Sequence, residues 1–117
     1  MLIGRRKSKN ADEDYNPMDG PYEYYVVYKE WDQTKKTSKF DRIQDARSMA
    51  YQILENKYLS KVHVRKTHKE LSTHDYLAGE VTRSKSNGKW EYFWTVRKTD
   101  CWFLKKNGTL GKKLEWR

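Results

Sequence analysis

Cysteine and long apolar runs are scarce in this sequence, and each scarcity excludes a class of protein. The one cysteine, Cys101, excludes an intramolecular disulfide and fits a reducing compartment. No run approaches the roughly 18 apolar residues that a membrane helix needs. Residues 1–4 are too short to be the apolar core of a signal peptide. We therefore expect a soluble, cytoplasmic protein that does not enter membranes.

Catalytic and metal-binding motifs are also missing. The sequence contains no Walker loop, no GxGxxG and no GxSxG motif. His63, His68 and His74 lie near Glu70 and Asp75 in the chain, but their spacing matches no familiar metal site, and a single cysteine cannot complete a CxxC zinc site. We predict a protein that is not an enzyme and that holds no metal and no cofactor.

Aliphatic residues are few, and aromatic residues replace them. The chain has 117 residues, 36% of them hydrophobic and 35% charged, and its mean hydropathy of −1.16 favours partial disorder. Five Trp, nine Tyr and three Phe oppose that tendency, because each ring can bury roughly 150 to 250 Å². The length then suits a single domain with a small aromatic core.

Positive charge is concentrated in the second half of the chain. The formal net charge is +9, and the first 55 residues hold ten basic and ten acidic side chains, whereas residues 56–117 hold fifteen and six. Such an excess favours a polyanionic partner, because the summed field attracts it. A basic surface that only keeps the protein in solution is the alternative.

The pattern predicts a tail followed by one folded domain. Residues 1–20 join a basic run to an acidic run and are predicted to be a disordered tail. Residues 21–117 are predicted to form a single α+β domain. Its expected architecture is a mostly antiparallel twisted sheet or half-barrel of five to six strands with one amphipathic helix, in the order β-α-β-β-β-β-β.

The first elements are predicted from composition and period. Residues 22–31 are rich in Tyr, Val and Trp and predict a strand, and the polar residues 32–39 predict a connection. Asp41 and Gln44 have the spacing of a helix capping box. The helix that follows should bury a stripe made of Ile43, Ala46, Ala50, Ile53 and Leu54. Residues 61–67 alternate and predict a second strand, and strand, helix and strand together make a parallel crossover plausible.

Two Asn-Gly pairs between strand-like runs predict two hairpins. With Asn87-Gly88 as a two-residue turn, Lys85 faces Trp90, Arg83 faces Tyr92, Val81 faces Trp94 and Gly79 faces Val96. With Asn107-Gly108 as another, Lys105 faces Leu110, Phe103 faces Lys112 and Cys101 faces Leu114. Cys101 is then a small core residue.

The turn end of the first hairpin is the most specific candidate site. There the register places rings beside cations on a part of the sheet that should extend beyond the core. Bases stack on exposed rings while Lys and Arg bind phosphates. The alternative is that these pairs only stabilise the hairpin. A second basic surface is expected on the strand of residues 61–67, where a merely solvated face is the alternative. The candidate nucleic-acid-binding residues are Lys61, His63, Arg65, Lys66, Arg83, Lys85, Lys89, Trp90, Tyr92, Arg97, Lys98, Lys105, Lys106, Lys112 and Lys113.

Two functional hypotheses follow. The first is a small non-enzymatic protein that binds RNA or single-stranded DNA through its C-terminal sheet. The second is a protein-binding regulator or inhibitor, such as a factor of a mobile element, that docks on the acidic or nucleic-acid-binding surface of an enzyme. Exposed Trp and Tyr side chains would serve either partner.

Overall fold

The computed structural model describes residues 21–71 and 73–115, in which it has one α-helix and seven β-strands. The elements are β1 (Tyr22–Glu30), β2 (Gln33–Lys36), α1 (Ile43–Lys57), β3 (Lys61–His68), β4 (Asp75–Ser86), β5 (Lys89–Val96), β6 (Asp100–Leu104) and β7 (Leu110–Leu114). The predicted disordered tail, residues 1–20, lies outside the described residues, and so do residues 116 and 117 at the end of the predicted domain.

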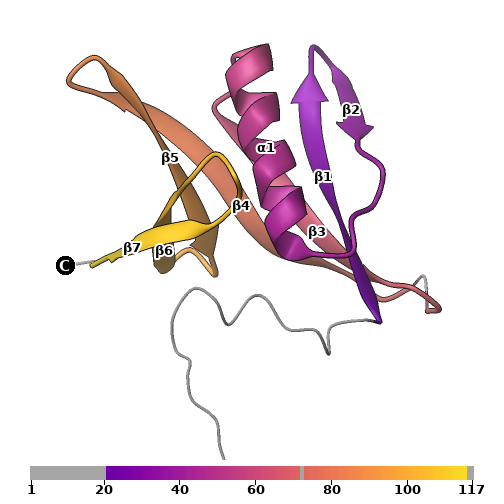
Figure 1. Cartoon of the computed structure of the whole chain (residues 1–117). Coiled ribbons are helices and arrows are strands. Elements are labelled where there is room, and N and C mark those ends of the chain that lie inside the picture. The colour runs from indigo at the N-terminus through magenta and orange to yellow at the C-terminus, as the bar shows by residue number, and fades with distance from the viewer. Residues whose placement is uncertain (1–20, 72, 116–117) are drawn as a thin grey trace, which may run out of the picture.

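The seven strands form one open antiparallel sheet in the order β2-β1-β3-β4-β5-β6-β7, with the single helix against it (Figure 1). The α+β class and the antiparallel sheet agree with the sequence-based prediction. The predicted number of strands was too low, because β2 was taken for a connection. All four residues of β2 are polar and exposed at the sheet edge, so no alternation marks them as a strand.

The additional strand changes the direction of β3. The chain runs out along β1 and back along β2, and α1 then returns it to the end of the sheet at which β3 begins (Figure 1). As a result β3 pairs with β1 in antiparallel fashion, with Val26 opposite Val64. The expected parallel crossover is therefore wrong, and one reversal between β1 and α1 explains why.

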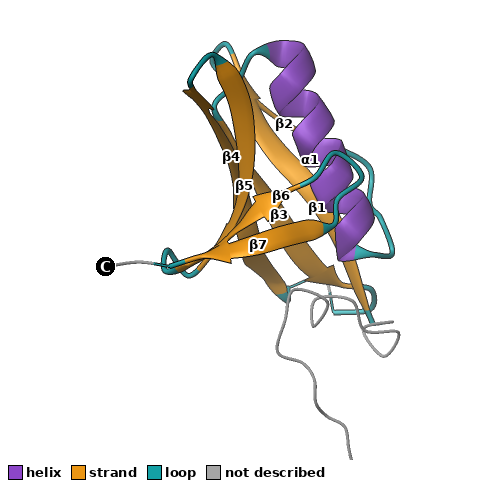
Figure 2. Ribbon diagram, turned by 60° about the vertical axis from the view of Figure 1, so that its left-hand side comes forward, coloured by secondary structure: helices purple, strands orange, loops and turns teal. Residues whose placement is uncertain are grey.

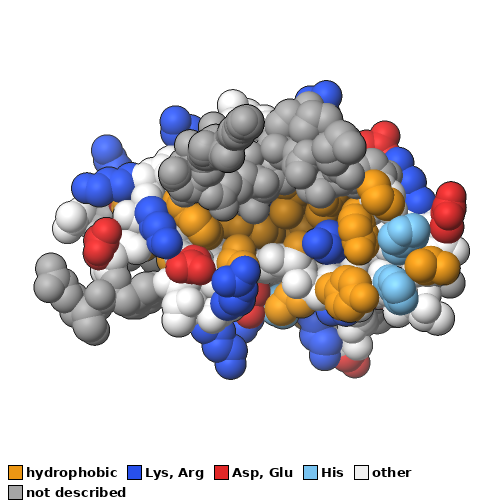
Figure 3. Space-filling view, turned by 90° about the horizontal axis from the view of Figure 1, so that it is seen from below, with side chains coloured by type: hydrophobic (Ala, Val, Ile, Leu, Met, Phe, Trp, Pro, Cys, Tyr) orange, Lys and Arg blue, Asp and Glu red, His pale blue; other side chains and the backbone are white. Residues whose placement is uncertain are grey.

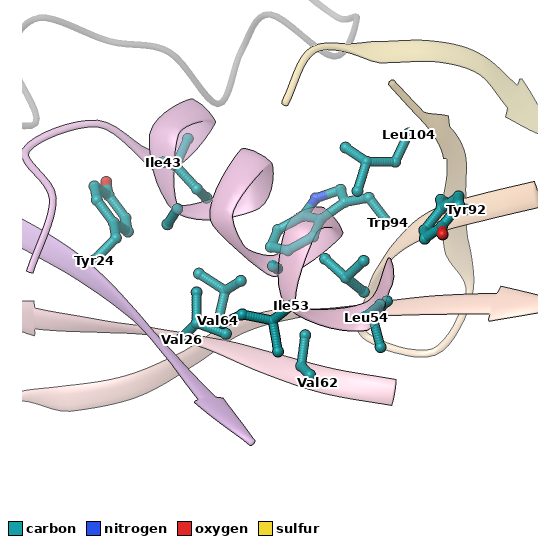
Figure 4. Packing of buried hydrophobic residues seen from close by; sticks show 13 residues of the cluster. Tyr24, Val26, Ile43, Ile53, Leu54, Val62, Val64, Tyr92, Trp94 and Leu104 are labelled. Atoms are coloured by element: carbon teal, nitrogen blue, oxygen red, sulfur yellow. The ribbon is translucent and has the colours of Figure 1, made fainter. Parts of the chain in front are cut away.

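The core lies between α1 and one face of the sheet. The predicted helical stripe is buried in full, and Arg47 is buried beside it. The alternation predicted for residues 61–67 is also confirmed, since Val62 and Val64 are buried against the helix. Figure 4 shows Trp94 of β5 at the centre of this cluster, between the helix and Leu104 of β6. An indole thus fills the space that the short aliphatic side chains of the helix leave.

The start of the helix differs from the prediction. Arg42 is the N-cap residue and no side-chain cap hydrogen bond is present, so the predicted capping box of Asp41 and Gln44 is wrong. The Asp41 side chain is exposed and its carboxylate lies 3.5 Å from Lys69 Nζ. Gln44 instead donates from Nε2 to the carbonyl of Asn107, at 3.2 Å. Gln44 therefore bonds to the β6–β7 turn, which is distant in the sequence, instead of capping the start of its own helix.

Both hairpins form, and the first has the predicted register from Glu80 to the turn, without the predicted pair of Gly79 and Val96. Asn87 and Gly88 have φ angles of 52° and 80°, and β4 and β5 pair as predicted. In the second hairpin Cys101 pairs with Leu114 as predicted, but Leu104 pairs with Leu110 after a register shift. The cause is a longer turn, in which the Gly108 amide donates to the Lys105 carbonyl and only Gly108 has a positive φ.

This longer turn holds the far side of the helix. Arg47 Nε donates to the Gly108 carbonyl at 2.9 Å, and Ser48 Oγ donates to the Lys106 carbonyl at 2.9 Å. The sheet therefore curls around α1: β1, β3 and β4 contact the helix, and the β6–β7 turn crosses in front of it in Figure 2.

Two glycine substitutions test this contact. Gly88→Ala and Gly108→Ala both place a side chain at a positive φ, of 80° and 91° respectively. At Gly88 nothing lies near the added Cβ, whereas at Gly108 the added Cβ would overlap the Gln44 carbonyl. We expect Gly88→Ala to lower the free energy of unfolding by about 1 kcal/mol, and Gly108→Ala to lower it by about 2 kcal/mol more. Urea denaturation measures both, and equal effects would contradict a tight contact between the turn and the helix.

Candidate nucleic-acid interface

Three large aromatic side chains are exposed at one end of the molecule. Trp31 lies in the β1–β2 turn, Tyr58 follows the last residue of α1, and Trp90 lies beside the β4–β5 turn. Figures 1 and 2 both show these three segments at the same end of the sheet. Trp31 is 94% exposed, Tyr58 85% and Trp90 48%. We call Trp31, Tyr58 and Trp90 the aromatic end.

Contacts between neighbouring residues join the three segments. Lys57 Nζ lies 3.0 Å from one carboxylate oxygen of Glu30, which joins the end of α1 to the end of β1. Lys35 Nζ lies 3.0 Å from the other oxygen. Hydrogen bonds from Lys35 and then Lys57 lower the pKa of the Glu30 carboxyl below its ordinary value. The segments that carry Trp31 and Tyr58 are thus held side by side.

Arg83 provides the second connection. Its guanidinium lies 4.1 Å from the centre of the Trp90 ring and 6.0 Å from that of Tyr58. The Tyr58 and Trp90 rings therefore lie on either side of one guanidinium, while Trp31 follows Glu30, which is paired with Lys57.

The backbone at two of these rings is unusual. Trp31 has a φ of 60° and Tyr58 a φ of 56°, both in the left-handed region. Tyr58 is the C-cap residue of α1. Near the end of a helix, the left-handed conformation is usually adopted by Gly or Asn. Large side chains are uncommon there because the Cβ crowds the backbone. The fold alone does not favour Trp or Tyr at these two positions.

Arg83 and Tyr92 do not have the exposed positions predicted for them. Arg83 is only 8% exposed, and its Nε donates to the Leu59 carbonyl at 2.8 Å. Its Nη1 donates to the Tyr92 hydroxyl at 3.2 Å, and the Tyr92 ring stacks on Tyr51 with 3.7 Å between centroids. Both residues attach the hairpin to the end of the helix, and both side chains are buried rather than exposed as predicted.

Four predicted residues remain exposed near the aromatic end. Lys85 and Lys89 flank the β4–β5 turn, Lys61 begins β3, and Lys85 Nζ lies 5.5 Å from the centre of the Trp90 ring. Lys85 shares the face of Trp90, whereas the register places Lys61 and Lys89 on the other face of the sheet at the same end.

The predicted basic surface on β3 is largely used within the protein. His63 Nε2 lies 3.3 Å from Glu80, and Arg65 Nε donates to Asp75 at 2.5 Å. Lys66 pairs with Tyr24 on the other face of the sheet and lies over the Tyr22 ring. The four residues therefore do not share one free cationic face. The alternation separates Lys66 from the others, and acidic residues of β4 meet two of them.

The remaining predicted residues lie elsewhere. Arg97 and Lys98 form the β5–β6 turn at the opposite end of β5, Lys105 and Lys106 lie in the β6–β7 turn, and Lys112 and Lys113 lie on β7. Lys106 lies 3.6 Å from Glu55, and Lys113 lies 3.1 Å from Asp100 and over the Trp102 ring. The predicted set therefore does not form a single site.

Two classes of site can be assessed directly. Within residues 21–71 and 73–115, no three His, Cys, Asp or Glu side chains gather in a group that could hold a metal ion. The same part of the chain has no helix that is long and apolar enough to cross a membrane. Cys101 is buried, as predicted, and the Thr95 hydroxyl lies 3.4 Å from its sulfur.

Sequence patterns did not reveal Trp31 and Tyr58 as members of the site. Alternation predicts that Trp31 lies on one face of the first strand, but in the structure β1 already ends at Glu30. Tyr58 follows Leu54 at helical spacing, and only the left-handed C-cap turns it away from the buried stripe. Neither turn contains the Asn-Gly pair that marks the β4–β5 turn, so no local signal was present.

Substitutions of Arg83 and Lys85 distinguish a buried cation that stabilises the fold from an exposed one that does not. We expect Arg83→Met to lower the free energy of unfolding by about 1 to 3 kcal/mol, because the Leu59 carbonyl and the Tyr92 hydroxyl lose their donor. Lys85→Met should change it by less than about 0.5 kcal/mol, since the side chain is exposed. Equal losses in urea denaturation would show that Arg83 is not buried in this way.

A pH series tests the Asp75 cluster. Burial alone would raise the pKa of the Asp75 carboxyl, but hydrogen bonds from Tyr25 (2.6 Å) and from Arg65 outweigh it and hold the pKa below its ordinary value. A lowered pKa stabilises the fold above the ordinary value and loses that contribution as the pH falls through the folded value. We expect Asp75→Asn to cost about 1 kcal/mol at neutral pH.

The difference between Asp75→Asn and the unchanged protein should shrink below about pH 4. Asp41→Asn, at an exposed carboxylate, should cost less than about 0.5 kcal/mol at any pH. Thermal unfolding at several pH values measures both, and a pH-independent loss at Asp75 would contradict the assigned pKa shift.

Comparison with known proteins adds no assignment to this geometry. A scan against protein-family models gives no match, and neither curated protein sequences nor solved structures give a significant match. The site is therefore interpreted from its own chemistry.

Proposed function

We propose that this chain is a small non-enzymatic protein that binds single-stranded RNA or DNA at the aromatic end. The observation that carries the proposal is the exposure of Trp31, Tyr58 and Trp90 on three separate segments at the same end of the sheet. Unpaired bases stack on such rings with little regard to sequence. A reducing, cytoplasmic setting fits the single buried thiol of Cys101.

The conformational free energy that Trp31 and Tyr58 cost the fold supports a role in binding rather than in stability. A residue other than glycine in the left-handed region costs roughly 1 to 2 kcal/mol. Trp31 and Tyr58 bear that cost while burying almost none of their own surface. Residues with a strained backbone and an exposed side chain contribute little to stability. A binding role therefore accounts for Trp31 and Tyr58 better than a packing role does.

The surrounding charge suits a polyanion. Five exposed lysines lie at this end of the sheet, on β2, α1, β3, β4 and β5 respectively: Lys35, Lys57, Lys61, Lys85 and Lys89. Glu30 offsets part of this charge through its pairs with Lys35 and Lys57. Lys61, Lys85 and Lys89 are the residues we propose for phosphate contacts, because phosphates lie beside stacked bases along a single strand.

The test is a titration of a labelled oligonucleotide of about 12 nucleotides, once as RNA and once as DNA, at about 50 and 200 mM salt. We expect the affinity to fall with salt by a log–log slope of several units, about 0.7 for each phosphate contacted. Trp31→Asn and Tyr58→Asn should each weaken binding roughly 5- to 100-fold, the equivalent of one lost stacking contact.

The same two variants should not destabilise the protein, since Asn tolerates a positive φ better than Trp or Tyr does. Urea denaturation therefore separates lost binding from lost folding. The control is Tyr76→Ser, which removes a half-exposed ring near the start of β4, at the other end of that strand from the aromatic end. Lack of binding at low salt, a flat salt dependence, or an equal loss in the control would contradict the proposal.

A further inference from the structure

The second feature of interest lies at the opposite end of the molecule, where β4 is paired on one side only. β4 begins at Asp75, but its pairing with β5 starts only at Glu80, opposite Thr95. β5 ends at Val96, and the chain then turns into β6. Among the described residues, the stretch of β4 before Gly79 thus pairs with β3 and has no strand on its other side. Such an edge offers backbone N–H and C=O groups to another chain.

A groove runs beside this edge. It has a volume of about 1000 Å³, and its apolar lining includes Leu77, Ala78, Phe93, Val96 and Leu114. Leu77 is 51% exposed there. Seen from the end opposite the aromatic end, hydrophobic side chains are exposed across the middle of the molecule, with Lys and Arg side chains near them (Figure 3). Aliphatic side chains of a partner would find apolar contacts along this groove.

The charged residues of the groove are mostly basic. Lys66, Arg97 and Lys98 line it, and Glu80, the one acidic residue among the described residues of its lining, lies 3.3 Å from His63. Arg97 and Lys98 have φ angles of 56° and 68°, so two long cationic side chains occupy positions at which Asn and Gly are favoured. As at the aromatic end, these residue types are unfavourable for the backbone conformation of the turn, and here they line the groove.

We infer that the groove binds an extended acidic segment of a partner protein, which adds a strand to the open edge of β4. A peptide supplies the backbone donors and acceptors that this edge lacks, and alternate side chains would enter the apolar groove while acidic ones meet Lys66, Arg97 and Lys98. A nucleic acid has no such peptide backbone and could not pair with the strand edge. The inference does not depend on the proposed function, because the two surfaces lie at opposite ends of β5.

A second copy of this chain fits the groove poorly. The strands at the edges of its sheet are β2 and β7, which carry Lys35, Lys36, Lys112 and Lys113. Like charges would therefore meet if either edge approached the basic groove. An acidic partner avoids that repulsion, which is also what the second sequence-based hypothesis, a protein-binding regulator, requires.

The experiment uses the full chain and a labelled peptide of about eight residues in which Glu and Val alternate. Fluorescence anisotropy should show binding at least about tenfold tighter than that of the matching Lys and Val peptide. A peptide with N-methyl groups along one edge should bind at least about tenfold more weakly, because it cannot form the strand hydrogen bonds.

The variant pair Arg97→Asn with Lys98→Gly removes the charge and places favoured residues in the turn, so the fold should be retained. It should weaken peptide binding about tenfold or more, whereas Trp31→Asn should leave peptide binding unchanged. Equal binding of the N-methylated peptide, displacement of the peptide by an oligonucleotide, or no binding by the full chain would each overturn the inference.

Discussion

The contact of Arg47 with Trp94 and the β6–β7 turn determines how the helix lies on the sheet. The guanidinium is buried 5.3 Å from the Trp94 ring centre, and its Nε donates to the Gly108 carbonyl. A buried cation is costly unless it is hydrogen-bonded, so this arrangement strongly constrains both the turn and the indole. With the start of α1 held by the turn, the far end of the helix comes to lie beside Arg83, and Tyr58 reaches the aromatic end.

Short-range patterns predicted the elements of this fold better than their assembly. Alternation around Val62 and Val64 and the register from Asn87-Gly88 were correct, because each depends on neighbouring residues. The edge strand β2 was missed since a fully exposed strand has no apolar pattern. Arg83 was misplaced for a different reason. Its burial depends on the Leu59 carbonyl, which lies 24 positions away in the chain and which no local motif indicates.

The left-handed residues connect the fold with the two proposed surfaces. Among the described residues other than glycine, five have a positive φ, and Asn87 is the one whose type suits that conformation. Trp31 and Tyr58 lie at the aromatic end, and Arg97 and Lys98 line the groove at the other end. Strain at exposed positions is informative because packing does not explain it. The strained residues lie at two distinct surfaces, an aromatic one suited to bases and a basic groove suited to an extended peptide.

The tryptophan side chains allow the most direct test of the central claim, that single-stranded nucleic acid binds at the aromatic end. Each indole N–H gives its own NMR signal, and Trp94 and Trp102 are internal references, since Trp94 is fully buried and Trp102 lies under Lys113 away from the three rings. On addition of a short single-stranded oligonucleotide, the signals of Trp31 and Trp90 should shift and those of Trp94 and Trp102 should not. Shifts confined to Trp102, or no shift at Trp31, would contradict the account.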